Sequence, residues 1–280
     1  MTMTQARAYT TALPTSSTRR LVAIGVCVAT ALLSALSLSA QTTLGSAQQF
    51  GVLGASTVTN TGPTVVTGLV GVFPGSAITG FPPGTALIAS HAVSQQGQLD
   101  ASNAFTSLGS TATTHDLSGQ DLGGMTLTPG VYNFTSSAQL TGNLFLNFLG
   151  NASSTFIFKI GSTLTTASNS SVFESGGPGA NVFWLVGSSA TLGTGTAFEG
   201  NIIADQSVTL TTGASISCGR AIALNGAVTM DSNVISDICA TDNGAPGSTV
   251  PEPGTAVLLS SGLFGLVPFV RRRTTMVTHS

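Results

Sequence analysis

The chain has 280 residues, enough for one large domain or two small ones, and only 6% of them are charged, against roughly 25% in an ordinary soluble domain. Residues 41–250 hold two basic side chains, Lys159 and Arg220, and nine acidic ones, a net charge of −7 (2 − 9). This excludes a nucleic-acid-binding surface, which needs a basic face to neutralise phosphates. The same segment contains 30 Thr and 26 Ser, so hydroxyl groups dominate its polar surface.

The first 40 residues have the organisation of a secretory signal peptide. Arg19 and Arg20 precede an uncharged apolar run at 21–38, and small residues ending at Ala40 follow it. A basic region, an apolar core and a small-residue cleavage site define such a signal. We predict that residues 1–40 direct export and are then removed, the alternative being a retained N-terminal anchor.

Residues 41–249 form the predicted folded domain. Short strands that alternate apolar and hydroxyl residues are separated there by Gly, Asn and Pro, which predicts a mostly β domain. One segment differs, since residues 85–108 contain no Pro and carry apolar residues at helical spacing, such as Ile88, Leu99 and Phe105. We expect one long helix at about 85–108, with Gly109 as its C-cap, lying against one face of the strands.

Four stretches in the second half of the domain align on one another. They begin at Thr163, Thr191, Thr209 and Thr229, and the last three starts are almost evenly spaced. A short period, with one strand and one turn per repeat, is typical of the stacked coils of a β-solenoid.

Alternation with a period of two assigns side chains to the two surfaces of these strands. On this alignment an apolar column points inward, and it consists of Leu164, Leu192, Leu210 and Met230. The four threonines named above then form an outward column in which successive coils are roughly 4.7 Å apart.

Three cysteines with no CxxC spacing do not indicate a zinc site. Cys27 lies in the apolar run of the predicted signal, which leaves an even pair, Cys218 and Cys239, in the exported domain. We predict one disulfide between them. Two buried thiols are the alternative.

The C-terminal segment begins with Pro251-Glu252-Pro253, continues with an apolar stretch at 255–270 and ends with three arginines at 271–273. The stretch is slightly shorter than the ~20 residues that span a bilayer as a helix, and the arginines would stay on the cytoplasmic side. This order resembles the PEP-CTERM sorting signal of Gram-negative bacteria. The resemblance implies processing by an exosortase-like enzyme, with residues 250–273 as a sorting and membrane segment and 274–280 as a tail. An ordinary tail anchor is the alternative.

Several motifs between residues 44 and 240 resemble the bacterial and fungal ice-binding proteins of the DUF3494 type. They are FGVLGASTVTNTGP at 50–63, GLVGVFPG at 68–75, ITGFPPG at 78–84, LTPGVY at 127–132 and the block 181–201. The resemblance implies a right-handed β-solenoid, formed discontinuously, with one α-helix packed alongside. It also implies binding to an ice crystal surface, and hence inhibition of ice growth and recrystallisation.

In that family ice is bound through a flat face whose motifs resemble Thr-Ala/Gly-X-Thr/Asn. Residues 166–169, Thr-Ala-Ser-Asn, match the motif in full, whereas 194–197, 212–215 and 232–235 depart from it, so we expect modest activity. The face that carries the threonines of the four repeats is the favoured site. Its predicted ice-binding residues are Thr163, Thr165, Thr166, Ser168, Thr191, Thr194, Thr196, Thr209, Thr211, Thr212, Thr229 and Ser232.

The composition independently favours ice as the ligand. Ice presents a repeating lattice of water oxygens with almost no net field, and a charged surface would keep its own hydration shell instead. Rows of threonine combine a methyl group with a hydroxyl, and a rigid coil repeats the pattern so that weak contacts add. Threonine is also simply common in β-strands, which is the structural alternative for any single position.

A polysaccharide lyase or a glycosidase is the first competing function. Glycoside hydrolysis needs a close pair of carboxylates, and the acidic residues are scattered along the sequence. His91 and His115 have no other expected ligand near them, so we predict no catalytic residue, no metal and no cofactor.

A matrix adhesin that holds polysaccharide is the stronger competitor. Sugar-binding surfaces usually carry aromatic platforms, whereas this domain has only Trp184, Tyr132 and phenylalanines that are expected to be buried. We therefore expect a monomeric ice-binding protein. It would be exported to the cell surface or the medium of a Gram-negative bacterium and held before processing by residues 255–270.

Overall fold

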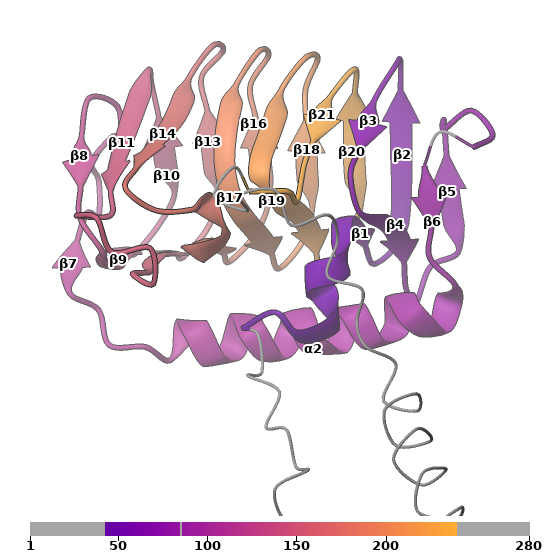
Figure 1. Ribbon diagram of the computed structural model, residues 1–280, viewed down its shortest axis with the longest axis horizontal. Helices are drawn as coiled ribbons and strands as arrows, with labels where there is room; N and C mark the ends of the chain where they lie inside the picture. Colours follow the sequence, from indigo (N-terminus) through magenta and orange to yellow (C-terminus); the bar gives the residue numbers. More distant parts are fainter. Residues whose placement is uncertain (1–42, 85, 240–280) are drawn as a thin grey trace, which may run out of the picture.

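The structure is a computed structural model that describes residues 43–84 and 86–239. The chain forms a 14-stranded sheet, a 7-stranded sheet and one long helix (Figure 1), in agreement with the predicted mostly β class. Every strand pairing in the described segments is parallel, for example β16 with β18 and β12 with β15. Successive turns of the chain add one strand to each face of a stack.

The larger sheet supplies two faces, because β17 (Ala197–Ala204) and β19 (Ser215–Ala223) are long enough to pass through both. What we name the helix face contains, in spatial order, β6 (Leu87–Ile88), β4 (Leu69–Val72), β1 (Phe50–Gly54), β19, β17, β15 (Val182–Val186), β12 (Phe156–Ile160), β9 (Gly130–Phe134) and β7 (His115–Asp116). What we name the third face contains β8 (Thr126–Leu127), β11 (Asn143–Asn147), β14 (Ser171–Ser175), the first halves of β17 and β19, β21 (Val234–Ile235) and β3 (Val65–Val66).

The smaller sheet forms the remaining face of the stack, and we name it the threonine sheet after the outward residues described below. Its order is β10 (Ala138–Leu140), β13 (Leu164–Thr166), β16 (Ala190–Leu192), β18 (Val208–Leu210), β20 (Val228–Asp231), β2 (Thr57–Thr61) and β5 (Ala77–Thr79). Strand neighbours in space are therefore not always neighbours in sequence.

The N-terminal strands join the stack beside the C-terminal ones. Strand β2 pairs with β20, aligning Val58 with Val228, and β1 pairs with β19, aligning Val52 with Ala221. After β19 the chain adds β20 to the threonine sheet and β21 to the third face. On the helix face, the strand beside β19 is β1, from the other end of the folded chain. The first and last parts of the folded chain thus pair directly and continue the same sheets.

Helix α2 (His91–Gly109) begins and ends later than predicted. Ser90 is its N-cap and accepts a hydrogen bond from the Val93 amide, whereas Leu87–Ile88 forms the short strand β6, so residues 86–90 are not helical. The C-cap is Ser110 rather than Gly109. The prediction missed this start because apolar residues of the preceding strand continued the helical spacing.

The residues that α2 buries are small or polar. Gly97 faces the Phe50 ring, where a Cβ atom would lie 2.6 Å from a ring carbon. Gln98 donates a hydrogen bond to the Ala223 carbonyl at 3.0 Å. Leu99, which was expected to contribute to the apolar face, is 53% exposed. The helix lies so close to the strands of the helix face that its contact positions have room for small side chains but not for large apolar ones.

The length of α2 matches the stack that it spans. Its 19 residues extend about 28 Å at ~1.5 Å per residue, and six strand steps separate β4 from β9 on the helix face, about 29 Å at ~4.8 Å each. The helix carries the chain from one end of the stack to the other, as Figure 1 shows. A 3-10 helix, η1 (Gly45–Gln49), packs beside it.

The interior of the stack is an apolar core with a line of aromatic rings. Trp184 lies with its ring centroid 3.8 Å from that of Phe158 and 4.9 Å from that of Phe198, and Tyr132 stacks on the other side of Phe158. The Trp184 indole donates a hydrogen bond to the Glu199 carbonyl. Tyr132 and Trp184 are both buried.

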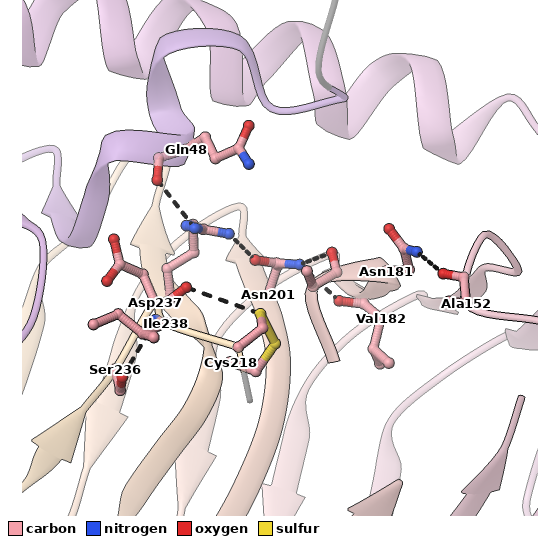
Figure 2. Close-up of a disulfide and its surroundings, with 12 residues drawn as sticks. Gln48, Ala152, Asn181, Val182, Asn201, Cys218, Ser236, Asp237 and Ile238 are labelled. Carbon is pink, nitrogen blue, oxygen red and sulfur yellow. Dashed lines mark hydrogen bonds between the residues drawn. A yellow bond between two sulfur atoms is a disulfide. The ribbon is translucent and has the colours of Figure 1, made fainter. Parts of the chain in front are cut away.

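Two residues of β19 hold the two ends of the folded chain. Cys218 forms a disulfide with Cys239, the pairing expected from the sequence, across a separation of 21 residues. Buried Arg220 donates hydrogen bonds to the carbonyls of Phe50 and Gln48 and to the side chain of Asn201. Figure 2 shows Cys218 beside Asn201 and Asp237, with Gln48 on the helix side.

Several predicted features lie outside the described residues. They are the signal at 1–40, the PEP-CTERM-like residues Pro251, Glu252 and Pro253, and the apolar stretch at 255–270. Within residues 43–84 and 86–239, no helix is long and apolar enough to cross a membrane.

Candidate functional site

A row of six threonines crosses the outer surface of the threonine sheet. The strand register aligns them residue by residue, in the spatial order Thr79, Thr59, Thr229, Thr209, Thr191 and Thr165. Neighbouring side chains in such a ladder are about 4.8 Å apart. We name these six residues the central row. The register continues from Thr165 to Gln139 and Asp121 at the end of the sheet.

The register differs from the predicted one at β13. The sequence alignment placed Thr163 beside Thr191, but Thr165 occupies that position and Leu164 pairs with Ala190. Thr163 lies two residues away, where its hydroxyl donates to the Ser137 hydroxyl at 2.8 Å. The prediction was wrong by two residues because a shift of two leaves every side chain on the same surface, so alternation could not detect it.

A second outward row follows the corner where the threonine sheet turns into the third face. Backbone amides just after the corner donate to carbonyls of the next coil in the stack. Asn169 donates to Thr194, Gly195 to Thr212, Gly213 to Asp231 and Ser232 to Thr61. The donors all have positive φ, the left-handed conformation that turns the chain. We name the residues before the corner the rim row, and they are Ser168, Thr194, Thr212, Asp231 and Thr61.

Two of the predicted ice-binding residues point into the stack. Thr166 is 2% exposed and Thr196 is fully buried, and their hydroxyls form a hydrogen bond with each other at 2.7 Å. The Thr166 hydroxyl also accepts from the Gly193 amide. These two hydroxyls satisfy interior backbone and cannot contact a surface ligand, so including them was an error. Alternation from buried Leu164 already points Thr166 inward.

The remaining predicted residues lie on or beside the two rows. Thr211 is partly buried, donates to the Leu192 carbonyl and lies 3.4 Å from the Thr194 hydroxyl, oxygen to oxygen. Ser232 lies at the corner itself, with φ of 56°. The N-terminal members of the rows, Thr59, Thr79 and Thr61, were missed. Thr59 and Thr61 belong to the Thr-Val-Thr-Asn-Thr-Gly segment at 57–62, which resembles the later repeats. Only the pairing of β2 with β20, and of β5 with β2, makes these threonines part of the same surface.

The seven strands of the threonine sheet contain a single charged residue, Asp231. Thr and Ser supply most other outward positions. A flat, regular and nearly uncharged hydroxyl surface can order water through groups that both donate and accept hydrogen bonds.

The third face carries a different set of side chains. Phe145 and Phe173 stack with ring centroids 5.4 Å apart, and they are 43% and 46% exposed. The expectation that all phenylalanines of the domain are buried was therefore wrong at these two positions. Alternation along β11 and β14 turns them outward, opposite buried Leu144 and Val172.

Two carboxyl groups meet at the edge of the third face, contrary to the expectation that the acidic residues are scattered. Glu174 and Glu199 each place Oε2 about 3 Å (2.9 and 3.1 Å) from the Cβ position of Gly179, in the short helix η2 (Gly179–Asn181). Neither Oε2 has a hydrogen-bond partner. Burial raises the pKa of Glu174 to about 7, and burial together with the charge of Glu174 raises the pKa of Glu199 to about 8.

This carboxyl pair is not arranged as a catalytic site. Buried Gly179 packs directly against both carboxyl groups, so even a Cβ atom added there would meet them. In the part of the chain that the structure describes, no group of three or more His, Cys, Asp or Glu side chains is placed to hold a metal ion. His91 and His115 lie on α2 and β7, and each contacts an aromatic ring.

The comparisons with known proteins agree on one family. The sequence pattern of the family described as Ice-binding-like matches residues 52–236. The ice-binding protein of Nostoc sp. (strain HG1) is 55% identical over 235 residues, which are 82% of this chain and 87% of that protein. The ice-binding protein of Flavobacterium frigoris (strain PS1) is 31% identical over 211 residues, covering 69% of this chain and 75% of the other.

Solved structures agree as well. The crystal structure of an ice-binding protein from an Antarctic biological consortium superposes with a TM-score of 0.66 at 42% identity, covering 71% of this chain and 92% of that one.

Proposed function

Because this chain belongs to the Ice-binding-like family, we propose that it adsorbs to ice through the outer surface of its threonine sheet and so inhibits ice growth and recrystallisation. The observation that carries the proposal is the central row, six threonines in unbroken register on six adjacent strands. The rim row adds a parallel line of hydroxyls.

The chemistry of these rows suits a water lattice. A hydroxyl both donates and accepts hydrogen bonds, as each water in ice does, and the methyl group beside it has no competing polar contact. Each contact is weak, but the parallel strands hold the side chains at a fixed spacing, so little ordering entropy is lost on adsorption. Summed over the face, such contacts give lasting attachment.

We further propose that the stacked strands form the right-handed, discontinuous β-solenoid expected from the sequence. Residues 1–40 would act as the export signal, 41–249 as the ice-binding domain and 250–273 as a PEP-CTERM-like segment cut by an exosortase-like enzyme. The monomer would then lie at the cell surface or in the medium of a Gram-negative bacterium. It would act without catalysis, cofactor or metal.

A matrix adhesin that binds polysaccharide is the second candidate, and one observation favours it. The exposed Phe145–Phe173 pair supplies the aromatic surface that sugar rings use for stacking. The pair lies on the third face and not on the threonine sheet, so the two functions can be separated by substitution.

The test is ice recrystallisation inhibition and thermal hysteresis of the purified protein. A Thr191→Tyr/Thr209→Tyr double variant places two bulky rings in the middle of the central row. We expect it to lose both activities while it keeps its circular dichroism spectrum and melting temperature.

The matched control is Thr126→Tyr, which puts the same ring on β8 at an exposed position of the third face. Activity that survives in the double variant would place the ice-binding site on another face. An inactive, folded parent protein that instead binds polysaccharide would replace ice binding by the adhesin function.

A further inference from the structure

Asp231 occupies an exceptional place in the rim row. The register pairs it with Thr61 on β2, and its backbone carbonyl accepts from the Gly213 amide, which follows Thr212 on the other side. The other positions of the row are Ser or Thr. Asp231 is also the only charged residue in the seven strands of the threonine sheet.

The carboxylate changes the hydroxyls next to it. Thr212 donates its hydroxyl proton to Oδ2, and Ser232 donates its own to Oδ1 at 3.0 Å. Both protons are therefore directed along the protein surface instead of toward water. By comparison, Thr194 in the same row shares one longer hydrogen bond with the Thr211 hydroxyl, at 3.4 Å, in which either oxygen can be the donor.

A carboxylate is also a poor match for ice. An ionised carboxylate only accepts hydrogen bonds, so it turns the hydrogens of every neighbouring water toward itself. Waters in ice each donate two and accept two hydrogen bonds, and a hydroxyl can join that pattern from either side. Pressing the charge against a crystal would also remove part of its liquid hydration shell, which is costly.

On these grounds we infer that Asp231 limits the strength with which this protein binds ice, and that removing its charge makes the protein a stronger ice binder. The inference rests on the proposed function, since it concerns the same surface. It names the residue that sets the activity of that surface, and this residue lies on the same strand as Thr229 of the central row.

The experiment compares thermal hysteresis of the full protein with that of two variants, D231N and D231T. D231N removes the charge with almost no change in shape, and D231T restores the residue type of the row. We expect each to raise hysteresis by about twofold or more at equal concentration, because the contacts of a rigid face act together.

The matched control is D116N. Asp116 is an exposed carboxylate on β7 that likewise accepts a hydroxyl hydrogen bond, from Ser118 at 2.6 Å, but it lies on the helix face. We expect D116N to leave hysteresis unchanged. An equal gain in D116N would show that net charge, and not the position of Asp231, is responsible, and would overturn the inference.

The failure of this inference is distinguishable from the failure of the proposed function. An active parent with folded D231N and D231T variants that show unchanged or lower hysteresis would overturn the role of Asp231 alone. A parent without any ice activity would overturn the proposed function as well. Melting temperatures of all variants identify a loss caused by unfolding.

Discussion

The threonine sheet and the third face are built from the same coils, yet they present different chemistry. Both consist of parallel strands with one strand per coil, and both rest on the same aromatic core. The threonine sheet repeats a hydroxyl side chain along its length, whereas the third face carries Phe145, Phe173 and Glu199 in neighbouring strands. The backbone is equally regular on both faces, so the proposed ice-binding surface differs from the third face only in the repetition of its outward residues.

This comparison predicts that changes to the third face alter stability without altering ice binding. The largest such effect is expected at its corner with the helix face, where the disulfide joins cysteines separated by 21 residues. A Cys218→Ala/Cys239→Ala variant should lose about 3 kcal/mol of unfolding free energy, because the unfolded chain regains the entropy of an open loop.

Denaturant unfolding of the variant and of the oxidised and reduced parent measures this loss. Hysteresis at low temperature, where the variant remains folded, should equal that of the parent. A variant that stays folded but loses hysteresis would show that the two faces are coupled.

The carboxyl pair of the third face should make the stability of the protein depend on pH. The pKa values of Glu174 and Glu199 are raised to about 7 and about 8, chiefly by burial. At a pH above the ordinary carboxyl pKa but below these raised values, the two groups keep their protons in the folded state and lose them in the unfolded state. The free energy of unfolding should therefore fall as the pH rises from about 4.5 to about 8 and then level off.

Both side chains are partly exposed, and solvent screening reduces the effect to about 1 kcal/mol. Melting temperatures measured across this pH range should fall less in a Glu174→Gln/Glu199→Gln variant than in the parent. Asp205→Asn is a suitable control, since its carboxyl lies at another corner and bonds to Gln206 and Asn225. Equal slopes in parent and double variant would contradict the assignment.

An effect of similar or smaller size is expected from the exposed phenylalanines. A Phe145→Ser/Phe173→Ser variant removes one stacked pair and should lose about 0.5–1.5 kcal/mol of stability. Ice recrystallisation inhibition should not change. A reduced inhibition in the folded variant would extend the ice-binding surface to the third face, and a loss of polysaccharide binding would identify the pair as a sugar site.

Much of the architecture could be predicted from the sequence. Low charge, a short sequence repeat and alternation within each strand indicated parallel stacked strands with hydroxyls outside. Leu192, Leu210 and Met230 do lie in one buried column. The helix was found, but its buried side was not, because Gly97, Gln98 and Ala101 pack against the sheet where large apolar residues were expected.

The composition of the candidate site was predicted less well than the fold. Alternation has a period of two, so it decides which surface a residue joins but not which neighbour it meets; this is why Thr165 and not Thr163 joins the row. Thr166 and Thr196 were included on motif similarity, although alternation assigns Thr166 to the interior.

What the sequence determined by itself is local: strand and turn residues, the outward position of hydroxyls and the low charge that favours a water lattice over an ionic ligand. Only the tertiary structure decided the extent of the surface. Strand β2 lies beside β20 although Val58 and Val228 come from opposite ends of the folded chain, and that pairing adds Thr59 and Thr79 to the central row and places Asp231 within the rim row. Pairings across such distances depend on the closure of the whole stack, which no local pattern of residues encodes.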